Sequence, residues 1–552
     1  MTAVSTMMRA ALSLNHFLDR AGRYHADVEI VSRMPDKSLH RHTFRDFHRR
    51  ALALAEVLVA AGVQPGDRVA TLSWNHYAHL ECYFGIPAAG AVMHNLNLRL
   101  FPHDLAFIVN HAKDRILIVD DVLLPLLAQF SKDVEFERII VVPLTGKPVP
   151  AGYDDYEELL RRAGGRFEPV VVEEHAPCGM CYTSGTTGHP KGVVYSHRST
   201  VLHTLVAALP GALGVSDTDI VLPVVPMFHA NAWGLPYLAV FVGAKLVLPG
   251  PHLDAESLLD LFQRERVTIT GGVPTIWLSI LQALRSAPSR WDLVPGMRML
   301  VGGSAAPESL FRGFDEFGLE VGTAWGMTET SPLGTVSALT AAMRALPEDQ
   351  QYALRVKQGR AAPLVDIRLI GEQGEVAWDG QSVGEIQVRG PWITGSYHEM
   401  PVSDSSFTAD GWLRTGDVGC IDGHGFLRLT DRTKDLIKSG GEWISSVDLE
   451  NAIMGHPAVL EAAVIAVPHP RWAERPLAVI VPRPGMSATA EEIQQYLSLT
   501  FAKWQVPDAY EFVAEIPRTS TGKFQAQSLY MSRSLVFRNL PVDVRGISAM
   551  NS

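Results

Sequence analysis

The chain has 552 residues, several times the size of a usual domain, so it must divide into two or more folded units. Hydrophobic residues make up 47% and charged residues 19%, a globular composition that excludes a disordered or repetitive chain. The formal net charge is -11 and no stretch gathers lysine and arginine, which argues against binding nucleic acid through its phosphates. Any polyphosphate ligand must therefore be held by local groups.

No segment has the pattern of a secretory signal or a membrane span. Residues 1–15 contain no continuous hydrophobic stretch and no small-residue cleavage pattern. The most apolar region, from Tyr237 to Leu248, is interrupted by Gly243 and Lys245 and is shorter than the ~20 residues that a spanning helix needs. We interpret it as core and expect a cytoplasmic protein without stable membrane insertion.

Helices and strands alternate along the first three-quarters of the chain. Apolar Leu52, Ala55 and Val59 recur at helical spacing and predict a helix from Arg45 to Gly62. The pattern next predicts a strand at 68–73, a helix at 102–110, a strand at 115–119, a helix at 122–130, a strand at 137–143, a helix at 255–265, a strand at 267–270 and a helix opening at Pro274. This rhythm predicts an α/β fold of mainly parallel sheets covered by helices, with ligands at the carboxyl ends of the strands.

The pattern changes after about Thr430, where we expect a domain boundary. Short strands near 425–429 precede a charged turn at 431–435, and Ser445 with Asp448 resembles a capping box that opens a helix stopped by Gly455. A strand at 462–467 follows. We therefore expect an N-terminal domain of residues 1–430, a hinge at 431–436 and a small, mobile α+β C-terminal domain of residues 437–552.

Four cysteines are present: Cys82, Cys178, Cys181 and Cys420. Cys178 and Cys181 form a C-x-x-C pattern, which is typical of half a zinc site or of a redox pair. No second pair or histidine partner follows at metal spacing. The favoured interpretation is that both are small residues in a buried strand.

The string from Tyr182 to Val193 (YTSGTTGHPKGV) is rich in hydroxyls and glycines and carries one cation, Lys191. Glycines let backbone N–H groups approach phosphate oxygens, hydroxyls add donors and the ammonium adds charge. The string is not a Walker A sequence, because Gly192 and not Ser or Thr follows Lys191. It predicts a loop that holds a polyphosphate.

This string resembles the phosphate loop of the adenylate-forming family that includes acyl-CoA synthetases, aryl-CoA ligases, luciferases and peptide-synthetase adenylation domains. Other stretches resemble the family's motifs in the family's order: 226–233 beside the acyl pocket, 302–305 against the adenine, 325–330 for nucleotide and metal, 415–417 for the ribose, 431–446 for the hinge and a glycine-rich loop, and 517–523 for a catalytic lysine. Residues 431–450, with residues 454–457 after them, most resemble bacterial medium- and long-chain fatty-acyl-CoA synthetases.

The resemblance implies two half-reactions. An acid attacks ATP to give acyl-AMP and pyrophosphate, and the thiol of coenzyme A then displaces AMP. It implies Mg²⁺ as cofactor, a carboxylic acid, ATP and coenzyme A as ligands, and a homodimer paired through the N-terminal domain. The C-terminal domain is expected to pivot between the two half-reactions.

The resemblance also assigns site residues. Catalytic roles fall on Lys523, Glu329 and His229, and Thr186 and Glu329 are expected to hold Mg²⁺ because both offer hard oxygen ligands. The residues expected at ATP or AMP are Thr183, Ser184, Gly185, Thr186, Thr187, Gly188, Lys191, Gly302, Gly303, Ser304, Thr323, Ala324, Trp325, Gly326, Thr328, Asp417, Arg432, Lys434, Lys438 and Trp443. Trp325 stands where the family usually has Tyr or Phe, and Ala324 where close relatives often have Gly.

His229, Trp233 and Gly234 are expected at the acyl chain, and Gly440, Gly441 and Glu442 at coenzyme A. Each assignment has a structural alternative: a packed core histidine, a buried tryptophan without a gating role, or surface lysines at positions 434, 438 and 523. No charged side chain occurs between Pro226 and Val242, which favours a hydrophobic acid.

Three rival functions remain open. A ligase for a short thioether, aryl or steroid side-chain acid would need the same phosphate machinery. A carrier-protein adenylation module is disfavoured because no serine-bearing carrier segment follows Lys523. A non-catalytic acyl- or nucleotide-binding protein is disfavoured by the presence of Lys523, Glu329 and Asp417.

Overall fold

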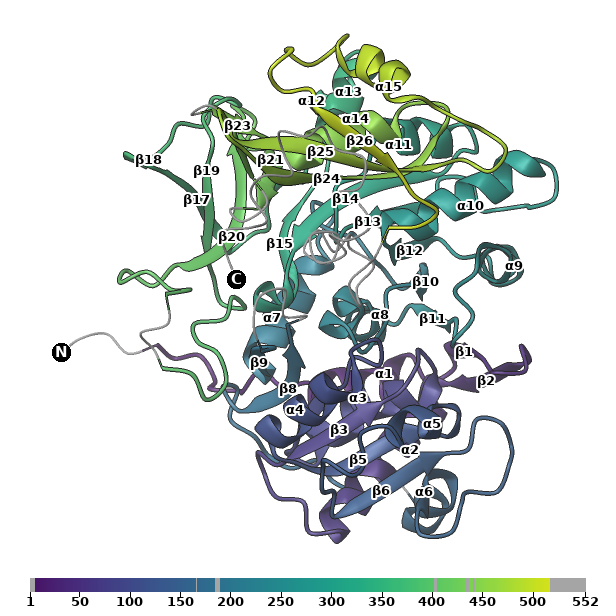
Figure 1. Ribbon diagram of the computed structural model, residues 1–552. Coiled ribbons are helices and arrows are strands. Elements are labelled where there is room, and N and C mark those ends of the chain that lie inside the picture. Colours follow the sequence, from purple (N-terminus) through teal and green to yellow (C-terminus); the bar gives the residue numbers. More distant parts are fainter. Residues whose placement is uncertain are drawn as a thin grey trace.

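The computed structural model describes residues 5–164, 166–183, 189–401, 405–432, 436–439 and 442–516. Three sheets and their helices form a large N-terminal part, and a fourth sheet belongs to a smaller C-terminal part (Figure 1). The predicted fold class, an α/β protein with mainly parallel sheets and a small α+β domain, is confirmed.

The first large sheet has seven strands and is parallel except at one edge, where β8 and β9 run antiparallel. Its spatial order is β7 (Asp154–Asp155), β6 (Arg138–Val142), β5 (Asp114–Asp120), β3 (Arg68–Leu72), β4 (Val92–Asn95), β8 (Pro177–Tyr182) and β9 (Gly192–Ser196).

The second large sheet has nine strands, of which the central ones are parallel. Its spatial order is β16 (Arg360–Ala361), β15 (Leu333–Val336), β14 (Glu320–Gly326), β13 (Arg298–Val301), β12 (Ile269–Gly272), β10 (Ile220–Pro223), β11 (Lys245–Leu248), β1 (Glu29–Arg33) and β2 (Leu39–Thr43). The carboxyl ends of β12, β13 and β14 therefore meet at one edge.

A third, five-stranded sheet is antiparallel throughout, a feature that the sequence did not predict. Its order is β18 (Gly374–Glu375), β17 (Asp366–Gly371), β19 (Gly384–Arg389), β20 (Leu413–Ile421) and β21 (Leu427–Arg432). The C-terminal sheet comprises β23 (Glu442–Ile444), β22 (Ile437–Ser439), β25 (Ala473–Pro482) and β24 (Val459–His469), with β26 (Ala509–Phe512) also paired to β25.

Helices cover these sheets. They are α1 (Asn15–Tyr24), α2 (Phe44–Ala60), α3 (Tyr77–Ala88), α4 (Pro102–Ala112), α5 (Leu124–Leu127), α6 (Tyr156–Ala163), α7 (His197–Ala207), α8 (Leu235–Val242), α9 (Ala255–Glu265), α10 (Pro274–Ser286), α11 (Glu308–Asp315), α12 (Ala341–Arg344), α13 (Glu348–Arg355), α14 (Ser446–Met454) and α15 (Ala490–Leu497). The described part of the chain also has three short turns of 3-10 type: η1 (Asp121–Leu123), η2 (Ala230–Gly234) and η3 (Thr328–Thr330).

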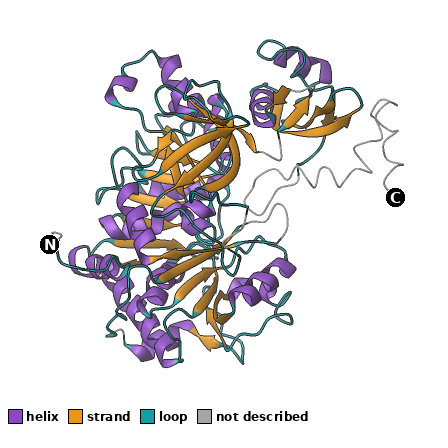
Figure 2. Ribbon diagram, turned by 90° about the vertical axis from the view of Figure 1, so that its left-hand side faces the viewer, coloured by secondary structure: helices purple, strands orange, loops and turns teal. Residues whose placement is uncertain are grey.

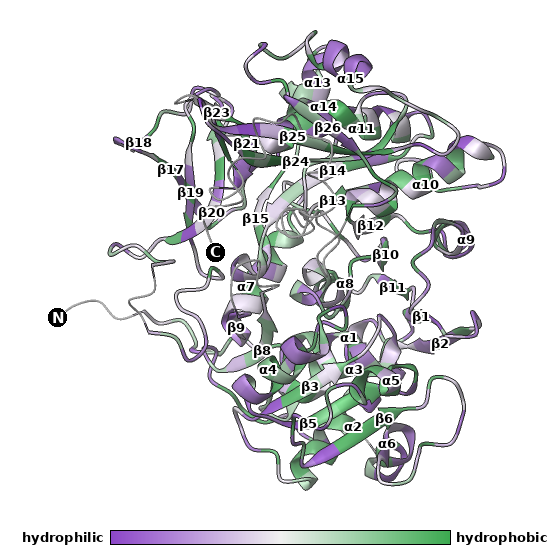
Figure 3. Cartoon of the chain, viewed as in Figure 1, coloured by the Kyte–Doolittle hydropathy of each residue, from purple (hydrophilic) through white to green (hydrophobic). Residues whose placement is uncertain are grey.

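The core lies between the two large sheets. Helix α3 is buried along its whole length and contacts β1 of the nine-stranded sheet as well as β3, β4 and β8 of the seven-stranded sheet. Figure 3 shows apolar residues along these inner strands and helices. Burying each large aliphatic or aromatic side chain there contributes about 1.5–3 kcal/mol.

Most predicted elements are found, and two differences have local causes. The helix expected at 122–130 is divided into η1 and the short α5, because Pro125 has no N–H and suits the first turn of a new helix. The strand expected at 267–270 begins later, at Ile269. Arg266 adopts a left-handed conformation (φ 57°) at the end of α9, and the N–H of Val267 still bonds back to Phe262.

The two apolar regions that the sequence assigned to core behave as expected. Residues 237–248 form most of α8, a left-handed Gly243 and β11. Cys178 and Cys181 are both buried thiols on β8. Among the described residues, no group of three His, Cys, Asp or Glu could hold a metal ion, and no helix is long and apolar enough to cross a membrane.

The C-terminal sheet and α14 and α15 stand apart from the large part of the molecule (Figure 2). Ser445 caps α14 by accepting a bond from Asp448 N–H at 3.0 Å, which is one of the two bonds of the capping box that the sequence resembled. The N–H of Ser446 donates to Asp431 Oδ2 at 2.7 Å, and Arg428 lies 3.5 Å from Asp448. Strand β21 and α14 are therefore linked by polar contacts on either side of residues 433–435.

Candidate active site

The stem of the glycine- and hydroxyl-rich loop lies where β8 ends and β9 begins. Thr183 N–H donates to the Lys191 carbonyl at 2.9 Å, and Lys191 N–H donates to Thr183 Oγ1 at 3.0 Å. These bonds extend the β8–β9 ladder by one residue pair and bring the two predicted phosphate-loop residues together. Ser184, Gly185, Thr186, Thr187 and Gly188 lie outside the described residues.

The Lys191 side chain reaches a second segment of the chain. Its ammonium lies 4.5 Å from the centroid of the Tyr397 ring and donates to Ser406 Oγ at 3.2 Å. The Tyr397 hydroxyl in turn donates to Glu329 Oε1 at 2.8 Å. A cation, an aromatic ring and a carboxylate from three distant segments thus form one cluster.

Glu329 is placed on η3 and is 6% exposed. Burial raises the pKa of its carboxyl above the ordinary value, although the Tyr397 hydroxyl and the nearby Lys191 ammonium act in the opposite direction. The Asp417 carboxylate also raises this pKa, so the two predicted carboxylates are close enough to interact. Tyr397 and Ser406 were not predicted, because neither belongs to a stretch with a recognisable chemical pattern.

A second cluster joins Trp325, Asp417 and Arg432. The Trp325 indole Nε1–H donates to Asp417 Oδ2 at 2.8 Å, and Arg432 Nε lies 3.4 Å from Asp417 Oδ1. The three residues come from β14, β20 and β21. The structure therefore brings together three of the residues predicted at the nucleoside end of ATP.

The remaining N-terminal residues predicted near the nucleotide lie directly after β13 and at the carboxyl end of β14. Gly302 is buried, whereas Gly303 and Ser304 are exposed and Gly303 has φ +85°. Gly326 must be glycine, because a Cβ there would lie 1.6 Å from the Pro332 carbonyl oxygen.

Several of these residues make fixed backbone contacts. Thr323 is buried and donates to the Arg355 carbonyl at 3.0 Å, and the Thr328 carbonyl accepts a bond from the Tyr195 hydroxyl at 2.8 Å. Ala324 is half-buried beside them. These contacts fix the carboxyl end of β14.

The predicted acyl-pocket residues lie on an unusual turn. Ala230, Asn231, Ala232 and Trp233 are four consecutive non-glycine residues with φ between 41° and 57°, followed by Gly234 at 77°. Each non-glycine residue in this left-handed region costs on the order of 1–3 kcal/mol. The turn therefore persists only because contacts around it outweigh the cost.

The turn places the Trp233 indole against two glycines. A Cβ built on Gly302 would lie 3.0 Å from the indole Cη2, and one on Gly271 would lie 3.4 Å from Cε3. The indole thus covers the carboxyl ends of β12 and β13. His229, which precedes the turn, is half-buried, and its N–H donates to the Pro226 carbonyl at 3.0 Å.

The C-terminal candidates are only partly described. Lys438 is exposed on β22, and its N–H donates to Glu474 Oε2 at 2.8 Å. Glu442 and Trp443 belong to β23. Lys434, Gly440, Gly441 and Lys523 lie outside the described residues.

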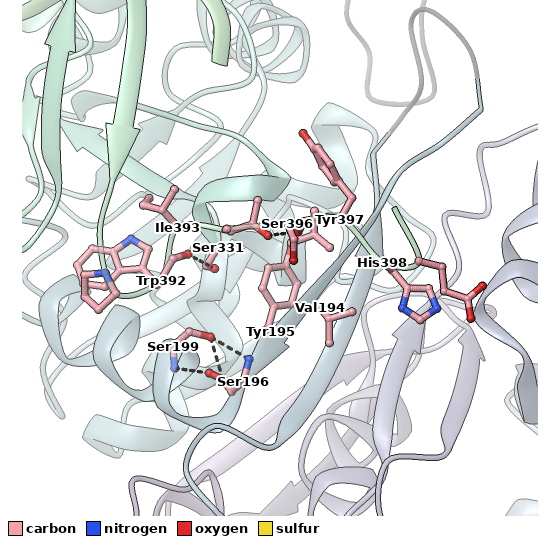
Figure 4. Close-up of a pocket in the computed structure, with 15 residues that line it drawn as sticks. Val194, Tyr195, Ser196, Ser199, Ser331, Trp392, Ile393, Ser396, Tyr397 and His398 are labelled. Atoms are coloured by element: carbon pink, nitrogen blue, oxygen red, sulfur yellow. Dashed lines mark hydrogen bonds between the residues drawn. The ribbon is translucent and has the colours of Figure 1, made fainter. Parts of the chain in front are cut away.

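A cavity of about 440 Å³ opens beside this site (Figure 4). It is lined by β9, the start of α7, Ser331 and residues 391–399, and Tyr397 belongs to its wall. Lys191, Trp325 and Asp417 are not among its lining residues. The cavity therefore neighbours the cluster around Glu329 without containing the predicted nucleotide residues.

Two family models match this chain. The AMP-binding enzyme model matches residues 17–398, and the AMP-binding enzyme C-terminal domain model matches residues 448–523. The chain belongs to the AMP-binding enzyme family. The first match contains the phosphate-loop stem, the acyl turn and Glu329, and the second ends at Lys523.

Relatives in this family align along nearly the whole chain. A long-chain-fatty-acid–CoA ligase of Thermus thermophilus is 51% identical over 95% of this chain and 96% of its own length. A medium-chain-fatty-acid–CoA ligase of Ectopseudomonas oleovorans is 43% identical over 94% and 95%. The crystal structure of the anthranilate CoA ligase AuaEII in complex with anthranoyl-AMP superposes with a TM-score of 0.86 at 25% identity, covering 96% of this chain and 98% of that one.

Proposed function

We propose that this chain is an ATP-dependent acid–thiol ligase that converts a medium- or long-chain fatty acid into its acyl-CoA, with release of AMP and pyrophosphate. The observation that carries the proposal is the whole-length similarity to two fatty-acid–CoA ligases. The clusters around Glu329 and Asp417 support it, because they gather family motifs from distant parts of the sequence at the ends of neighbouring strands.

In the first half-reaction a carboxylate oxygen of the acid attacks the α-phosphorus of ATP. A carbon–oxygen–phosphorus linkage forms, the bond to the β-phosphate breaks, and pyrophosphate leaves. Two anions approach each other, so cations must offset their repulsion and stabilise charge that develops on the phosphate. Lys523 is the proposed source of that charge, with Lys191 and Thr183 at the stem of the phosphate loop beside the outer phosphates.

The metal ligands are proposed to be Glu329 and Thr186. Glu329 suits this role because it is a buried carboxylate in the same cluster as Lys191, and a hard oxygen donor is what Mg²⁺ prefers. When bound, the ion would neutralise phosphate charge. Glu329 would orient the triphosphate against the loop stem, and Tyr397 would hold the Glu329 carboxylate in place through its 2.8 Å bond.

The nucleoside is proposed to bind between β13, β14 and β20. Asp417 would accept bonds from the ribose hydroxyls, since a carboxylate has acceptor sites beyond those used by Trp325 and Arg432. Trp325, Ala324, Gly326 and Thr328 would flank the base on one side, and Gly302, Gly303 and Ser304 on the other. Arg432, Lys434, Lys438 and Trp443 would complete the contacts.

In the second half-reaction the coenzyme A thiolate attacks the acyl carbonyl carbon. The thioester bond forms, the bond to AMP breaks, and AMP leaves with the oxygen. Gly440, Gly441 and Glu442 are the proposed coenzyme A loop. A pivot of the C-terminal domain about residues 431–436 would exchange Lys523 for this loop, so that one cleft serves both reactions.

The acid is proposed to be hydrophobic. The segment from Pro226 to Val242 carries no Asp, Glu, Lys or Arg that could pair with a second polar group on the substrate. His229, Trp233 and Gly234 would line the start of the acyl site. A cytoplasmic location and a homodimer remain parts of the proposal, and light scattering of the purified protein tests the dimer.

An acid-panel assay tests the function. Purified protein is given ATP, Mg²⁺ and one acid at a time, and pyrophosphate release is measured before and after coenzyme A is added. We expect release with medium- and long-chain fatty acids and an acyl-CoA product. Preference for a short thioether, aryl or steroid side-chain acid would overturn the substrate. Pyrophosphate release without thioester formation would favour a carrier-protein module, and no release with any acid would favour a binding protein.

A further inference from the structure

The left-handed turn of residues 230–233 is held by a buried pair of side-chain amides. Asn231 lies in the middle of the turn and is 5% exposed. Its Oδ1 accepts a bond from Asn95 Nδ2 at 2.9 Å, and the Cys181 thiol also donates to it, at 3.7 Å. Burial raises the pKa of Cys181 to about 11, so its thiol keeps the proton at neutral pH.

The partners of Asn231 belong to a rigid part of the fold. Asn95 is the last residue of β4 and is 2% exposed, and Cys181 lies on the neighbouring β8. Thr71 Oγ1 on β3 donates to Asn95 Oδ1 at 2.8 Å and fixes the plane of that amide. Three strands of the seven-stranded sheet therefore hold a turn that follows β10 of the nine-stranded sheet.

The far end of the turn has little space in which to relax. A Cβ on Gly234 would lie 2.7 Å from His203 Cε1, so the backbone passes directly over a buried imidazole ring. The Tyr83 hydroxyl bonds to the Met227 carbonyl upstream of the turn. With both flanks fixed, the bonds that Asn95 and Cys181 donate to the Asn231 amide oxygen reach the middle of the strained segment, and the Asn95 bond is the shorter of the two.

We propose that Asn95 and Asn231 are positioning residues that hold this turn so that the Trp233 indole covers Gly271 and Gly302, and that the pair thereby sets which hydrophobic acids the enzyme accepts. The inference rests on the proposed function, because it gives the pair a role in acid selection. A buried amide pair satisfies donor and acceptor only when both partners are present. Loss of either amide therefore frees the turn and lets the indole leave the two glycines.

The test compares two variants with a matched control. Asn95→Ala removes the partner amide, whereas Asn231→Gly removes the amide from the turn but eases the left-handed backbone. The control is Asn110→Ala, an exposed asparagine whose Nδ2 donates to the Asp133 carbonyl. The kcat and KM values are measured with hexanoate, dodecanoate and hexadecanoate, and the KM for ATP is measured alongside.

We expect both variants to change the kcat/KM ratio between hexadecanoate and hexanoate by about tenfold, the scale of discrimination that an apolar pocket provides. The KM for ATP should stay within about twofold in the same variants. Asn110→Ala should match the wild type. Adding Trp233→Ala should remove the effect of Asn95→Ala on the chain-length ratio, because the pair acts through the indole.

Three results would overturn the pair's role. Wild-type selectivity in Asn231→Gly would show that the backbone alone decides the conformation of the turn. An equal loss of activity for all acids would show a merely structural role. If the Asn95→Ala effect on the chain-length ratio persisted without Trp233, the pair would not act through the indole. If Asn95→Ala does not fold, Asn231→Gly and Cys181→Ala are compared with the wild type instead. A wild type inactive on every acid refutes the proposed function, whereas an active wild type with unaltered variants refutes only this inference.

Discussion

The nucleotide side and the acyl side of the candidate site are held in different ways. Around Glu329, charged and aromatic side chains contact one another directly: Lys191 lies over Tyr397, and Tyr397 bonds to the carboxylate. At the acyl side the decisive feature is the backbone, with four left-handed residues held by Asn95 from another sheet. One region depends on side-chain chemistry and the other on a strained conformation.

This difference predicts how each region responds to substitution. Removing a charged group from the nucleotide side should affect all acids equally, because ATP chemistry is common to them. Removing a support from the acyl turn should affect acids unequally.

Replacing Lys523 by alanine is expected to have the largest effect. The ammonium is the proposed charge at the reacting phosphate, and loss of such a group typically costs about 10²–10³-fold in kcat. ATP binding should remain, as measured by calorimetry, while pyrophosphate release falls for every acid. Lys132→Ala, at an exposed position, is the control, and an unchanged adenylation rate in Lys523→Ala would refute the assignment.

Replacing Glu329 by glutamine should lower adenylation by about 10²-fold, since the proposed metal ligand loses its charge. The same substitution should leave the folded protein equally stable or more stable. The pKa of the Glu329 carboxyl is raised in the folded state, so the native protein holds this proton more tightly than the unfolded chain does. The wild type therefore loses stability as the pH rises from the unfolded pKa through the raised folded pKa. The glutamine variant should therefore melt at or above the wild-type temperature at neutral pH, and this advantage should vanish in acid. A lower melting temperature at neutral pH would contradict it.

Replacing Tyr397 by phenylalanine removes one donor from the Glu329 carboxylate. A hydrogen bond to a charged group contributes about 1.5–3 kcal/mol, so we expect a tenfold or greater loss in kcat/KM for Mg-ATP. The Tyr397 bond favours the ionised form, so its loss should raise the pKa of Glu329 further and move the acid limb of the pH–rate profile to higher pH. An acid limb of the pH–rate profile that stays at the wild-type pH would show that Tyr397 does not influence the pKa of Glu329.

Replacing Trp325 by phenylalanine should have the smallest effect of the four. The ring is kept, and only the Nε1–H bond to Asp417 is lost. Loss of one partly buried hydrogen bond to a charged group predicts a several-fold rise in the KM for ATP, with kcat and chain-length preference unchanged. Chain-length preference is the discriminating measurement, because a change in it would show that the two sides of the site are not independent.

The sequence indicated the residues that cluster on the proposed nucleotide side better than it indicated the shape of the turn on the proposed acyl side. Thr183, Lys191, Glu329 and Asp417 stand in contiguous motifs whose residue types suit phosphate, metal and ribose. Tyr397 and Ser406 were missed, since a single tyrosine or serine in a loop has no pattern until folding brings it to Lys191. The antiparallel sheet of residues 366–432 was missed too, although the rhythm of the large sheets was found.

For the acyl side, the sequence indicated His229, Trp233 and Gly234 but not the shape of the turn. Nothing in the string from Ala230 to Trp233 demands left-handed backbone, because none of these residues is glycine. Asn95 is 136 residues away from Asn231 in the chain. The local backbone preference of these residues disfavours the left-handed turn, and the contact with the distant Asn95 outweighs that preference.

Local sequence was enough to predict the alternation of helices and strands, the buried strand that holds the two neighbouring cysteines, and the residue types available for phosphate and metal. These follow from periodicity and from side-chain chemistry, which are local properties. Only the packed chain brings Tyr397 between Lys191 and Glu329, and only there does Asn95 of the seven-stranded sheet meet Asn231 on the turn that follows β10. Such contacts depend on how strands are ordered within sheets, and that order is a property of the whole packed chain.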